Sequence, residues 1–299
     1  MTSPTEKLDF STLLPPSWET TVVTWLQMDI PKFDIGGFVV GESNQTANIL
    51  GKSEGVICGK PFVDAIFKYL GCQVTWLREE GSVITKDQAK AKLVVAKVEG
   101  PVRKLLLGER TALNLMARAS GIASRAREVS SLVKSKGWKG MVAATRKTTP
   151  GFSLVEKYAV LVGGATTHRM DLSNMVMLKD NHIWSTGSIT NSVKKAKIAA
   201  GHATKVEVEC QSLEEAYEAA SAGAEIVMLD NFTPEDLKRD AHTFKQKFPH
   251  VIVEASGGIT KETICDYISN DVDVVSQGSL TQGYGAVDFS MKLPKPQQS

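Results

Sequence analysis

The chain has 299 residues, enough for one large domain or two unequal ones, and its 42% hydrophobic content is sufficient for a full core. Lysine and arginine total 35 against 33 acids, and a net charge of +2 does not favour bulk binding to nucleic acid. There is no apolar run of membrane-spanning length, no signal-peptide pattern and no CxxC pair among the four cysteines. We therefore expect a cytoplasmic protein with reduced thiols and no membrane or nucleic-acid partner.

The chain up to about residue 105 alternates short β-like runs with turns. The runs have period-two patterning and glycine boundaries, and they cover residues 38–41, 56–59, 72–77 and 92–100. One helical pattern lies among them, at 61–70. An Ala- and Leu-rich segment with helical spacing follows at 104–137, and Gly137 is expected to end that helix. This region therefore predicts a twisted sheet with a helix or two, followed by one long helix.

From residue 141 a unit of apolar strand, polar tip and helix recurs. The predicted strands cover 141–145, 175–179, 205–209, 225–230, 251–256 and 272–278. The predicted helices between the later strands cover 212–223, 233–248 and 260–269, with Ser212 and Thr233 as N-caps. Strands spaced in this way with helices between them favour a parallel sheet covered by helices, most simply an α/β barrel, in which we count six strands.

Charged side chains follow several of these strands. Functional groups in α/β barrels lie at the carboxyl ends of the strands. Arg146 and Lys147 stand there between an apolar strand and a rigid Thr-Thr-Pro-Gly turn, and Lys179 directly ends the next strand. His168 and Arg169 form a second basic pair on a loop. These cations favour a site for a small, multiply charged anion, although ordinary solvated charges are the alternative for each pair.

Two acids end neighbouring strands of almost wholly apolar character. Glu209 and Asp230 each need a cation, because a buried unpaired carboxylate is costly. Oxygen ligands of this kind suit Mg²⁺ carried in with a phosphate substrate, and a structural ion pair is the competing interpretation. Glu207 precedes Glu209 by two positions, which leaves open that one of the two faces the helices.

A phosphate site is predicted late in the barrel. The sequence SGGIT at 256–260 places Ser256, Gly257 and Gly258 just ahead of the predicted helix at 260–269. Free N–H groups and the positive end of a helix dipole at such a turn attract phosphate. Gly278 ends the following strand, where barrels often bind phosphate.

Taken in order, the segments GERTALN (108–114), TRKTTPG (145–151), THRMDL (167–172), MLKDNHI (177–183), VEVEC (206–210), IVMLDNF (226–232), EASGGI (254–259) and SQGSLT (276–281) closely resemble the quinolinate phosphoribosyltransferase family. The resemblance implies an incomplete α/β (TIM-like) barrel at 114–281. It also implies an N-terminal open-faced α/β sandwich at 1–113 that is joined by the C-terminal tail, 282–299. The family converts quinolinate and phosphoribosyl pyrophosphate to nicotinate mononucleotide, pyrophosphate and carbon dioxide in NAD biosynthesis, with Mg²⁺ as the cofactor.

The resemblance also implies roles for single residues. The two carboxylates of quinolinate would be bound by Thr145, Arg146, His168, Arg169 and Lys179, with Arg110 donated across the interface of a homo-oligomer, either a dimer or a hexamer. Lys147 would contact phosphoribosyl pyrophosphate. Glu209 and Asp230 would contact the ribose hydroxyls and the metal, directly or through water or substrate, and they would be catalytic together with Lys147. The 5′-phosphate would lie against Ser256, Gly257, Gly258 and Gly278.

The chain departs from the family pattern in one place. After TTPG the family usually has Leu and then Arg, whereas Phe152, Ser153 and Leu154 stand here. We expect altered loop packing or subunit contact rather than lost activity, because the listed cations are all retained. Two alternatives stay open: a nicotinate phosphoribosyltransferase without decarboxylation, and a barrel that binds a phosphorylated metabolite without turnover.

Overall fold

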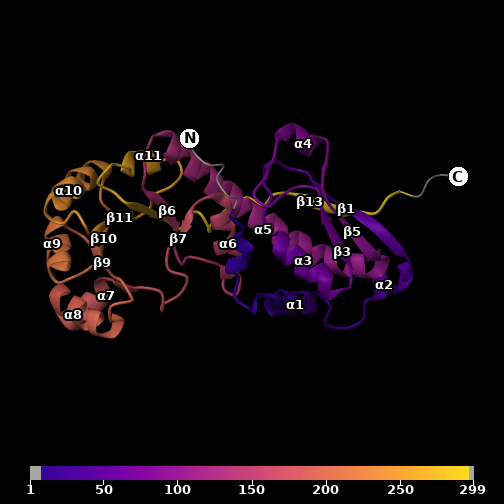
Figure 1. Cartoon of the computed structure of the whole chain (residues 1–299), viewed down its shortest axis with the longest axis horizontal. Coiled ribbons are helices and arrows are strands. Elements are labelled where there is room, and N and C mark those ends of the chain that lie inside the picture. The colour runs from indigo at the N-terminus through magenta and orange to yellow at the C-terminus, as the bar shows by residue number, and fades with distance from the viewer. Residues whose placement is uncertain (1–7, 296–299) are drawn as a thin grey trace. The chain divides into compact units, whose positions relative to one another are not determined.

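The structure is a computed structural model that describes residues 8–295 (Figure 1). By its internal contacts the chain divides into two compact units. The first contains the chain up to Arg125, Leu154–Gly164 and the residues from Tyr284 onward, and the second contains Ala126–Ser153 and Ala165–Gly283. The boundaries expected from the resemblance, 1–113 with 282–299 and then 114–281, stay a prediction.

The first unit is built on an antiparallel sheet with the strand order β13-β1-β5-β3. These strands are β13 (Phe289–Lys292), β1 (Asn44–Gly51), β5 (Leu93–Pro101) and β3 (Gln73–Trp76). A second small sheet pairs β2 (Gly55–Val56) with β4 (Val83–Ile84). The other elements of this unit are a 3-10 helix (Phe10–Leu13), α1 (Trp18–Asp29), α2 (Ile35–Val40), α3 (Lys60–Tyr69), α4 (Lys86–Lys90) and α6 (Ser153–Gly163), whose first residue belongs to the second unit. The expected twisted sheet is therefore confirmed, and the C-terminal strand β13 completes it.

Two predicted strands of this unit are wrong. Residues 38–41 were expected to be a strand, but they belong to helix α2 and its C-cap, because the Asp34 carboxylate accepts the N–H of Gly37 at 2.8 Å and caps the helix. The strand expected at 56–59 is reduced to Gly55–Val56. Gly59 adopts a left-handed φ of +108° before α3, and the Glu80 carboxylate accepts its N–H at 2.7 Å. Side-chain capping of helix ends thus overrode the apolar runs.

The long predicted helix is confirmed as α5 (Val102–Ser135), whose 34 residues run from the first unit into the second. Its buried face includes Leu105, Met116 and Ile122. Gly137 follows the helix with a φ of +77°, as expected of a residue that ends a helix.

The second unit is a seven-stranded sheet with the order β7-β6-β12-β11-β10-β9-β8, and all of its pairings are parallel. The strands are β6 (Met141–Ala144), β7 (Thr166–Thr167), β8 (Val176–Leu178), β9 (Val206–Cys210), β10 (Ile226–Asp230), β11 (Ile252–Ser256) and β12 (Val274–Gln277). In the part of the chain that the structure describes, the edge strands β7 and β8 do not pair with each other, so the barrel is incomplete. Six of the seven strands were predicted. The seventh, β7, has two residues and is too short to show a period.

Helices flank the later strands of this sheet. They are α7 (Asp180–Thr186), α8 (Ile189–Ala200), α9 (Leu213–Ser221), α10 (Pro234–Lys247) and α11 (Ile264–Tyr267). Figure 1 shows α8, α9 and α10 along the outer side of β9, β10 and β11. The side chains of Ser212 and Thr233 accept backbone N–H groups at the starts of α9 and α10, which confirms both predicted N-caps. Between residues 8 and 295 we find no helix with both the length and the apolar character that crossing a membrane requires.

Two expectations about the strand ends need correction. The helix predicted at 260–269 consists only of Ile264–Tyr267, so it does not begin directly behind the glycine pair, and a helix dipole no longer supports a phosphate site there. Glu207 and Glu209 do not point to opposite faces of β9. Side chains two positions apart in a strand lie on the same face, and both carboxylates project into the interior of the barrel.

Candidate active site

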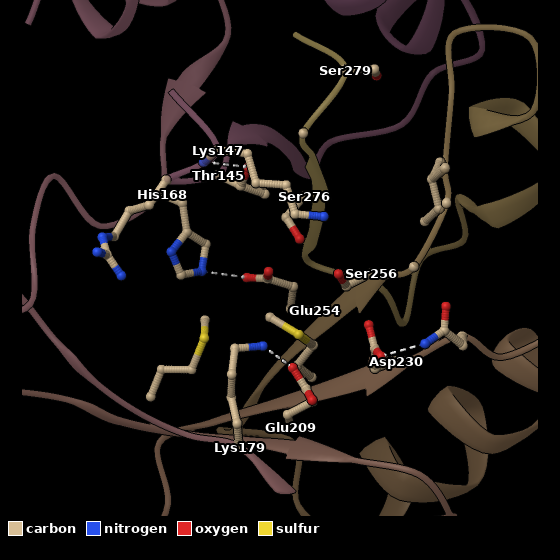
Figure 2. Close-up of a pocket in the computed structure, with 18 of the residues that line it drawn as sticks. Thr145, Lys147, His168, Lys179, Glu209, Asp230, Glu254, Ser256, Ser276 and Ser279 are labelled. Carbon is tan, nitrogen blue, oxygen red and sulfur yellow. Dashed lines mark hydrogen bonds and ion pairs between the residues drawn. The ribbon is translucent and has the colours of Figure 1, made fainter. Parts of the chain in front are cut away.

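A cavity of about 730 Å³ opens at the carboxyl ends of the parallel strands (Figure 2). Twelve of the thirteen residues predicted for the site line it: Thr145, Arg146, Lys147, His168, Arg169, Lys179, Glu209, Asp230, Ser256, Gly257, Gly258 and Gly278. The thirteenth, Arg110, lies on α5 in the first unit, where its side chain is exposed, and it is not among the lining residues. The structure therefore gathers residues from seven strand ends that span more than a hundred positions of sequence.

The loop after β6 presents Arg146 and Lys147, and both residues are exposed. The N–H of Lys147 donates to Thr145 Oγ1 at 3.3 Å, and Thr281 Oγ1 donates to the carbonyl of Lys147 at 2.9 Å. A β-carbon added to Gly278 would lie 2.9 Å from Lys147 Cδ. The missing side chain at 278 thus gives the lysine stem its space, and the two hydrogen bonds fix its backbone.

The same loop contains the predicted departure from the family pattern. The N–H of Phe152 donates to the carbonyl of Thr149 at 3.0 Å, which closes the turn of the TTPG sequence. Ser153 then begins α6. The three residues of the departure therefore form the junction between this turn and the helix.

Arg169 extends beyond β7 toward Met177 of β8, and its Nη2 lies 3.3 Å from Met177 Sδ. Burial and the nearby Arg146 guanidinium both lower the pKa of Arg169. Two guanidinium groups that repel each other beside a cavity are stabilised by an anion between them.

Lys179 and Glu209 form an ion pair at the cavity, drawn as a dashed line in Figure 2. The Lys179 side chain is 46% exposed and the Glu209 side chain 11% exposed. The N–H of Lys179 donates to His182 Nδ1 at 3.1 Å, which fixes the backbone where β8 ends. The sequence analysis weighed Mg²⁺ against an ion pair for Glu209, and the structure shows an ion pair with Lys179. Asp230 accepts a hydrogen bond from Asn231 Nδ2 at 2.5 Å.

Beneath these groups lies a cluster of His168, Glu207 and Glu254. His168 Nε2 is 3.2 Å from Glu254 Oε2 and 3.4 Å from Glu207 Oε2. The side chains are 8%, 2% and 0% exposed for His168, Glu254 and Glu207 respectively. The other ring nitrogen, Nδ1, accepts the backbone N–H of Arg169 at 2.8 Å. Both ring nitrogens of His168 therefore have partners within the protein.

The cluster retains a proton at neutral pH. Burial alone would lower the pKa of His168, but the contacts with Glu207 and Glu254 outweigh burial and raise it to about 9. Burial also raises the pKa of Glu207. The backbone N–H of Arg169 points at Nδ1, so the ring's proton on Nε2 is the one that faces the two carboxylates.

Glu254 was missed by the sequence analysis, although a signal was available. It lies two positions before Ser256 in β11 and so points to the same face as that predicted site residue. A carboxylate at such a position in an otherwise apolar strand needs a partner inside the barrel. The partner, His168, comes from a strand that the sequence did not reveal.

The turn after β11 is held by left-handed backbone. Gly257 and Gly258 have φ values of +102° and +62°, and Asn231 across from them has +59°. The N–H of Asn231 donates to the carbonyl of Ser256 at 3.0 Å. A β-carbon at Gly257 would lie 2.4 Å from Asn231 Oδ1 and 2.6 Å from its backbone nitrogen. Only glycine fits at position 257.

The parallel half-barrel and its charged cavity define a class of protein. They place anion-binding cations, two acids and a glycine turn at the carboxyl ends of the strands, as in α/β-barrel enzymes that act on phosphorylated substrates. Residues 122–292 match the C-terminal domain model of quinolinate phosphoribosyl transferase, and residues 21–120 match its N-terminal domain model. The chain belongs to the quinolinate phosphoribosyl transferase family.

Similar proteins agree with this membership. The chain is 52% identical over 282 residues to the nicotinate-nucleotide pyrophosphorylase (carboxylating) of Rattus norvegicus, covering 94% of this chain and 93% of the relative. It is 48% identical over 299 residues to that of Dictyostelium discoideum, covering 96% of this chain and 100% of the relative. The solved nicotinate-nucleotide pyrophosphorylase of Francisella tularensis aligns with a TM-score of 0.85 at 33% identity, covering 94% of this chain and 98% of the other. The predicted family and fold class are confirmed.

Proposed function

We propose that the cavity of the second unit is the site where this chain transfers the phosphoribosyl group of phosphoribosyl pyrophosphate to quinolinate and removes one carboxylate. The products are nicotinate mononucleotide, pyrophosphate and carbon dioxide. The observation that supports the site most directly is the convergence of Arg146, Arg169 and Lys179 on one cavity. Quinolinate carries two adjacent carboxylates, and guanidinium groups bind carboxylates through two parallel hydrogen bonds.

In this proposal the cations at the ends of β6, β7 and β8 bind quinolinate. Arg146 and Arg169 take its carboxylates, with Thr145 and His168 beside them. Lys179 is paired with Glu209 in the structure and turns to the substrate when a carboxylate arrives. An exposed lysine changes partner at little cost, because such pairs contribute little to stability.

The other side of the cavity binds phosphoribosyl pyrophosphate. Ser256, Gly257, Gly258 and Gly278 bind its 5′-phosphate through backbone N–H groups and the Ser256 hydroxyl. Lys147 contacts the pyrophosphate. Glu209 and Asp230 accept hydrogen bonds from the ribose hydroxyls.

Glu209 and Asp230 also fit a role in holding Mg²⁺. They are oxygen donors on the neighbouring strands β9 and β10, both line the cavity, and neither carboxylate is buried away from it. When bound, Mg²⁺ would neutralise charge on the leaving pyrophosphate.

The chain's own residues would act mainly by position and charge. The pyridine nitrogen attacks the anomeric carbon as pyrophosphate leaves, and the ribose acquires positive charge that Glu209 and Asp230 stabilise. Lys147 stabilises the departing pyrophosphate. Loss of the carboxylate next to the ring nitrogen then leaves an electron pair on a carbon beside a cationic nitrogen. The fixed cations hold the ring in place throughout.

A product assay tests this function. We expect the purified protein to release carbon dioxide and form nicotinate mononucleotide from quinolinate and phosphoribosyl pyrophosphate, with a requirement for Mg²⁺. Nicotinate in place of quinolinate should give little turnover, because it has one carboxylate for the same set of cations. Equal use of nicotinate would favour the non-decarboxylating alternative. Binding of both substrates without any product would favour the non-catalytic one.

Arg110 is proposed to complete the site of a neighbouring copy, which makes the active form a homo-oligomer. Its side chain is exposed on α5, and it makes no ion pair or hydrogen bond with the residues described here, 8–295. A mixing experiment tests this role. The Arg110→Ala and Arg169→Ala proteins should each be nearly inactive, but a mixture that exchanges subunits should regain activity, because a mixed dimer has one intact site. Absence of recovery in mixtures shown to exchange would contradict the proposal.

A further inference from the structure

Burying the cluster of His168, Glu207 and Glu254 costs free energy of folding. Glu207 is fully buried, and neither of its carboxylate oxygens has a hydrogen-bond partner among the described residues. Glu254 Oε1 also has no hydrogen-bond partner among the described residues. Apolar residues of similar size usually give a fold at least equal stability at such places. The two acids therefore do something that packing alone does not require.

Their shared contact is the ring of His168, and the ring in turn controls the backbone of Arg169. The N–H of His168 donates to the carbonyl of Ala144 at 2.9 Å and continues the pairing of β7 with β6. At the next residue the pattern changes, because the N–H of Arg169 donates to His168 Nδ1 instead of to a neighbouring strand. The orientation of the ring thus fixes where the chain leaves the sheet and where Arg169 begins.

The acids fix that orientation from the opposite edge of the ring. Glu207 comes from β9 and Glu254 from β11, so Nε2 is approached by two strands that are separated by β10 in the sheet. Figure 2 shows the ring of His168 joined by a dashed line to the carboxylate of Glu254 beside it. An imidazole with one nitrogen facing two carboxylates and the other accepting a backbone N–H cannot rotate or flip without losing contacts on both sides.

We propose that Glu207 and Glu254 are positioning residues for quinolinate binding: they hold the His168 ring so that Nδ1 fixes the backbone of Arg169 and directs its guanidinium into the cavity. This inference rests on the proposed function, in which Arg169 binds a quinolinate carboxylate. The acids themselves touch no substrate. They act through His168, and the effect of losing them should fall on quinolinate rather than on the other substrate.

The test uses Glu254→Gln in the full-length protein. The change keeps the size of the side chain and removes its charge. We expect the quinolinate KM, and the quinolinate Kd measured by calorimetry without turnover, to rise about tenfold, as for loss of a hydrogen bond to a charged group. The KM for phosphoribosyl pyrophosphate should stay within about twofold of the parent value, because Arg169 is proposed to bind only quinolinate. Glu207→Gln removes a charge 3.4 Å from His168 Nε2 without breaking a hydrogen bond, so it should show the same pattern with a smaller rise.

Asp271→Asn is the matched control. Asp271 Oδ2 contacts His242 Nδ1 at 3.1 Å, so the control removes the same kind of carboxylate–histidine contact at a surface where His242 is 62% exposed. Neither substrate should be affected by it. Thermal unfolding of all three variants separates misfolding from loss of position.

Three results would overturn the inference. The first is normal quinolinate affinity in both Glu254→Gln and Glu207→Gln. The second is an equal loss for the two substrates. The third is a divalent ion bound in stoichiometric amount to the parent protein and lost from Glu254→Gln, because the three side chains would then be ligands of a metal. Failure of the parent protein to turn over quinolinate would instead reject the proposed function, so the two failures are distinguishable.

Discussion

Two acid–base groups inside the same half-barrel differ in their access to solvent. At the cavity, Lys179 and Glu209 form a pair whose side chains are 46% and 11% exposed. Deeper, His168, Glu207 and Glu254 are 8%, 0% and 2% exposed. Burial decides what each group can do. A cation in contact with water exchanges its partner readily, whereas a buried group is held in one arrangement by the cost of leaving a charge unpaired.

The comparison separates binding from positioning. Lys179 belongs to the side chains that meet the substrate, and its pairing with Glu209 keeps it in place until then. The deeper cluster stays intact and holds the backbone of Arg169 in one position. Similar residue types thus take different parts in one site because they lie at different depths.

The largest expected effect is on stability, from His168→Ala. The change removes the ring whose Nε2 faces two buried carboxylates, and we expect the free energy of unfolding to fall by about 3 kcal/mol, as when one partner of a buried pair is removed. Urea denaturation at pH 7 measures it. His242→Ala, which breaks a surface pair, should change it by less than about 1 kcal/mol. Equal losses of stability in His168→Ala and His242→Ala would show that burial does not make the His168 contacts stronger than the surface contact.

The next effect is on binding, from Arg169→Ala. Loss of a bidentate guanidinium contact should raise the quinolinate KM about a hundredfold, with little change in the KM for phosphoribosyl pyrophosphate. Arg169→Lys should recover only a small part, because a lysine cannot make the two parallel hydrogen bonds. Steady-state kinetics with each substrate varied in turn checks both. A normal quinolinate KM in Arg169→Ala would contradict the assignment.

A third effect is the pH dependence of stability. The pKa of His168 is raised to about 9, so its contribution to stability is fully present below the ordinary value of 6.5 and is lost as the pH rises through 9. The raised pKa of Glu207 acts in the same direction, since the folded state there also retains a proton. We expect the stability difference between the parent and His168→Gln to shrink between pH 6.5 and 9.5. A difference that grows over this range would mean that the cluster holds no proton.

The smallest stability effect is expected for Lys179→Met. The Lys179 side chain is almost half exposed, so its pair with Glu209 should contribute less than about 1 kcal/mol to unfolding. Activity should nevertheless fall, because the cation is proposed to bind substrate. Parallel urea denaturation and kinetic measurements reveal whether the two properties separate. A large loss of stability would show that this pair behaves like the buried cluster.

The sequence predicted the elements whose pattern is long or repeated. Helix α5 and six parallel strands were recognised because their periods persist, and the ends of those strands gave ten of the twelve predicted residues that line the cavity. The strand predicted at 38–41 was wrong because one capping hydrogen bond, from the N–H of Gly37 to Asp34, decided the conformation. Strand β7 was missed because its two residues gain their pairing from β6 rather than from their own pattern.

The deeper cluster shows why the rest of the site was not predictable. Glu254 and His168 are 86 positions apart in the chain and meet only because β7 and β11 bring their side chains to the same interior. The resemblance named His168 but gave no role to its partners. Which neighbour satisfies a buried group depends on the three-dimensional arrangement of strands, and periodicity carries no information about that arrangement.

The close approach of Gly257 to Asn231 also limits how the sequence of this protein can diverge. Any side chain at 257 collides with the atoms of Asn231, including its main-chain nitrogen, so no rearrangement of one side chain relieves it. The loops that follow β10 and β11 are therefore expected to change together in evolution. A substitution at Gly257 should be tolerated only together with an insertion or deletion that moves the loop of Asn231.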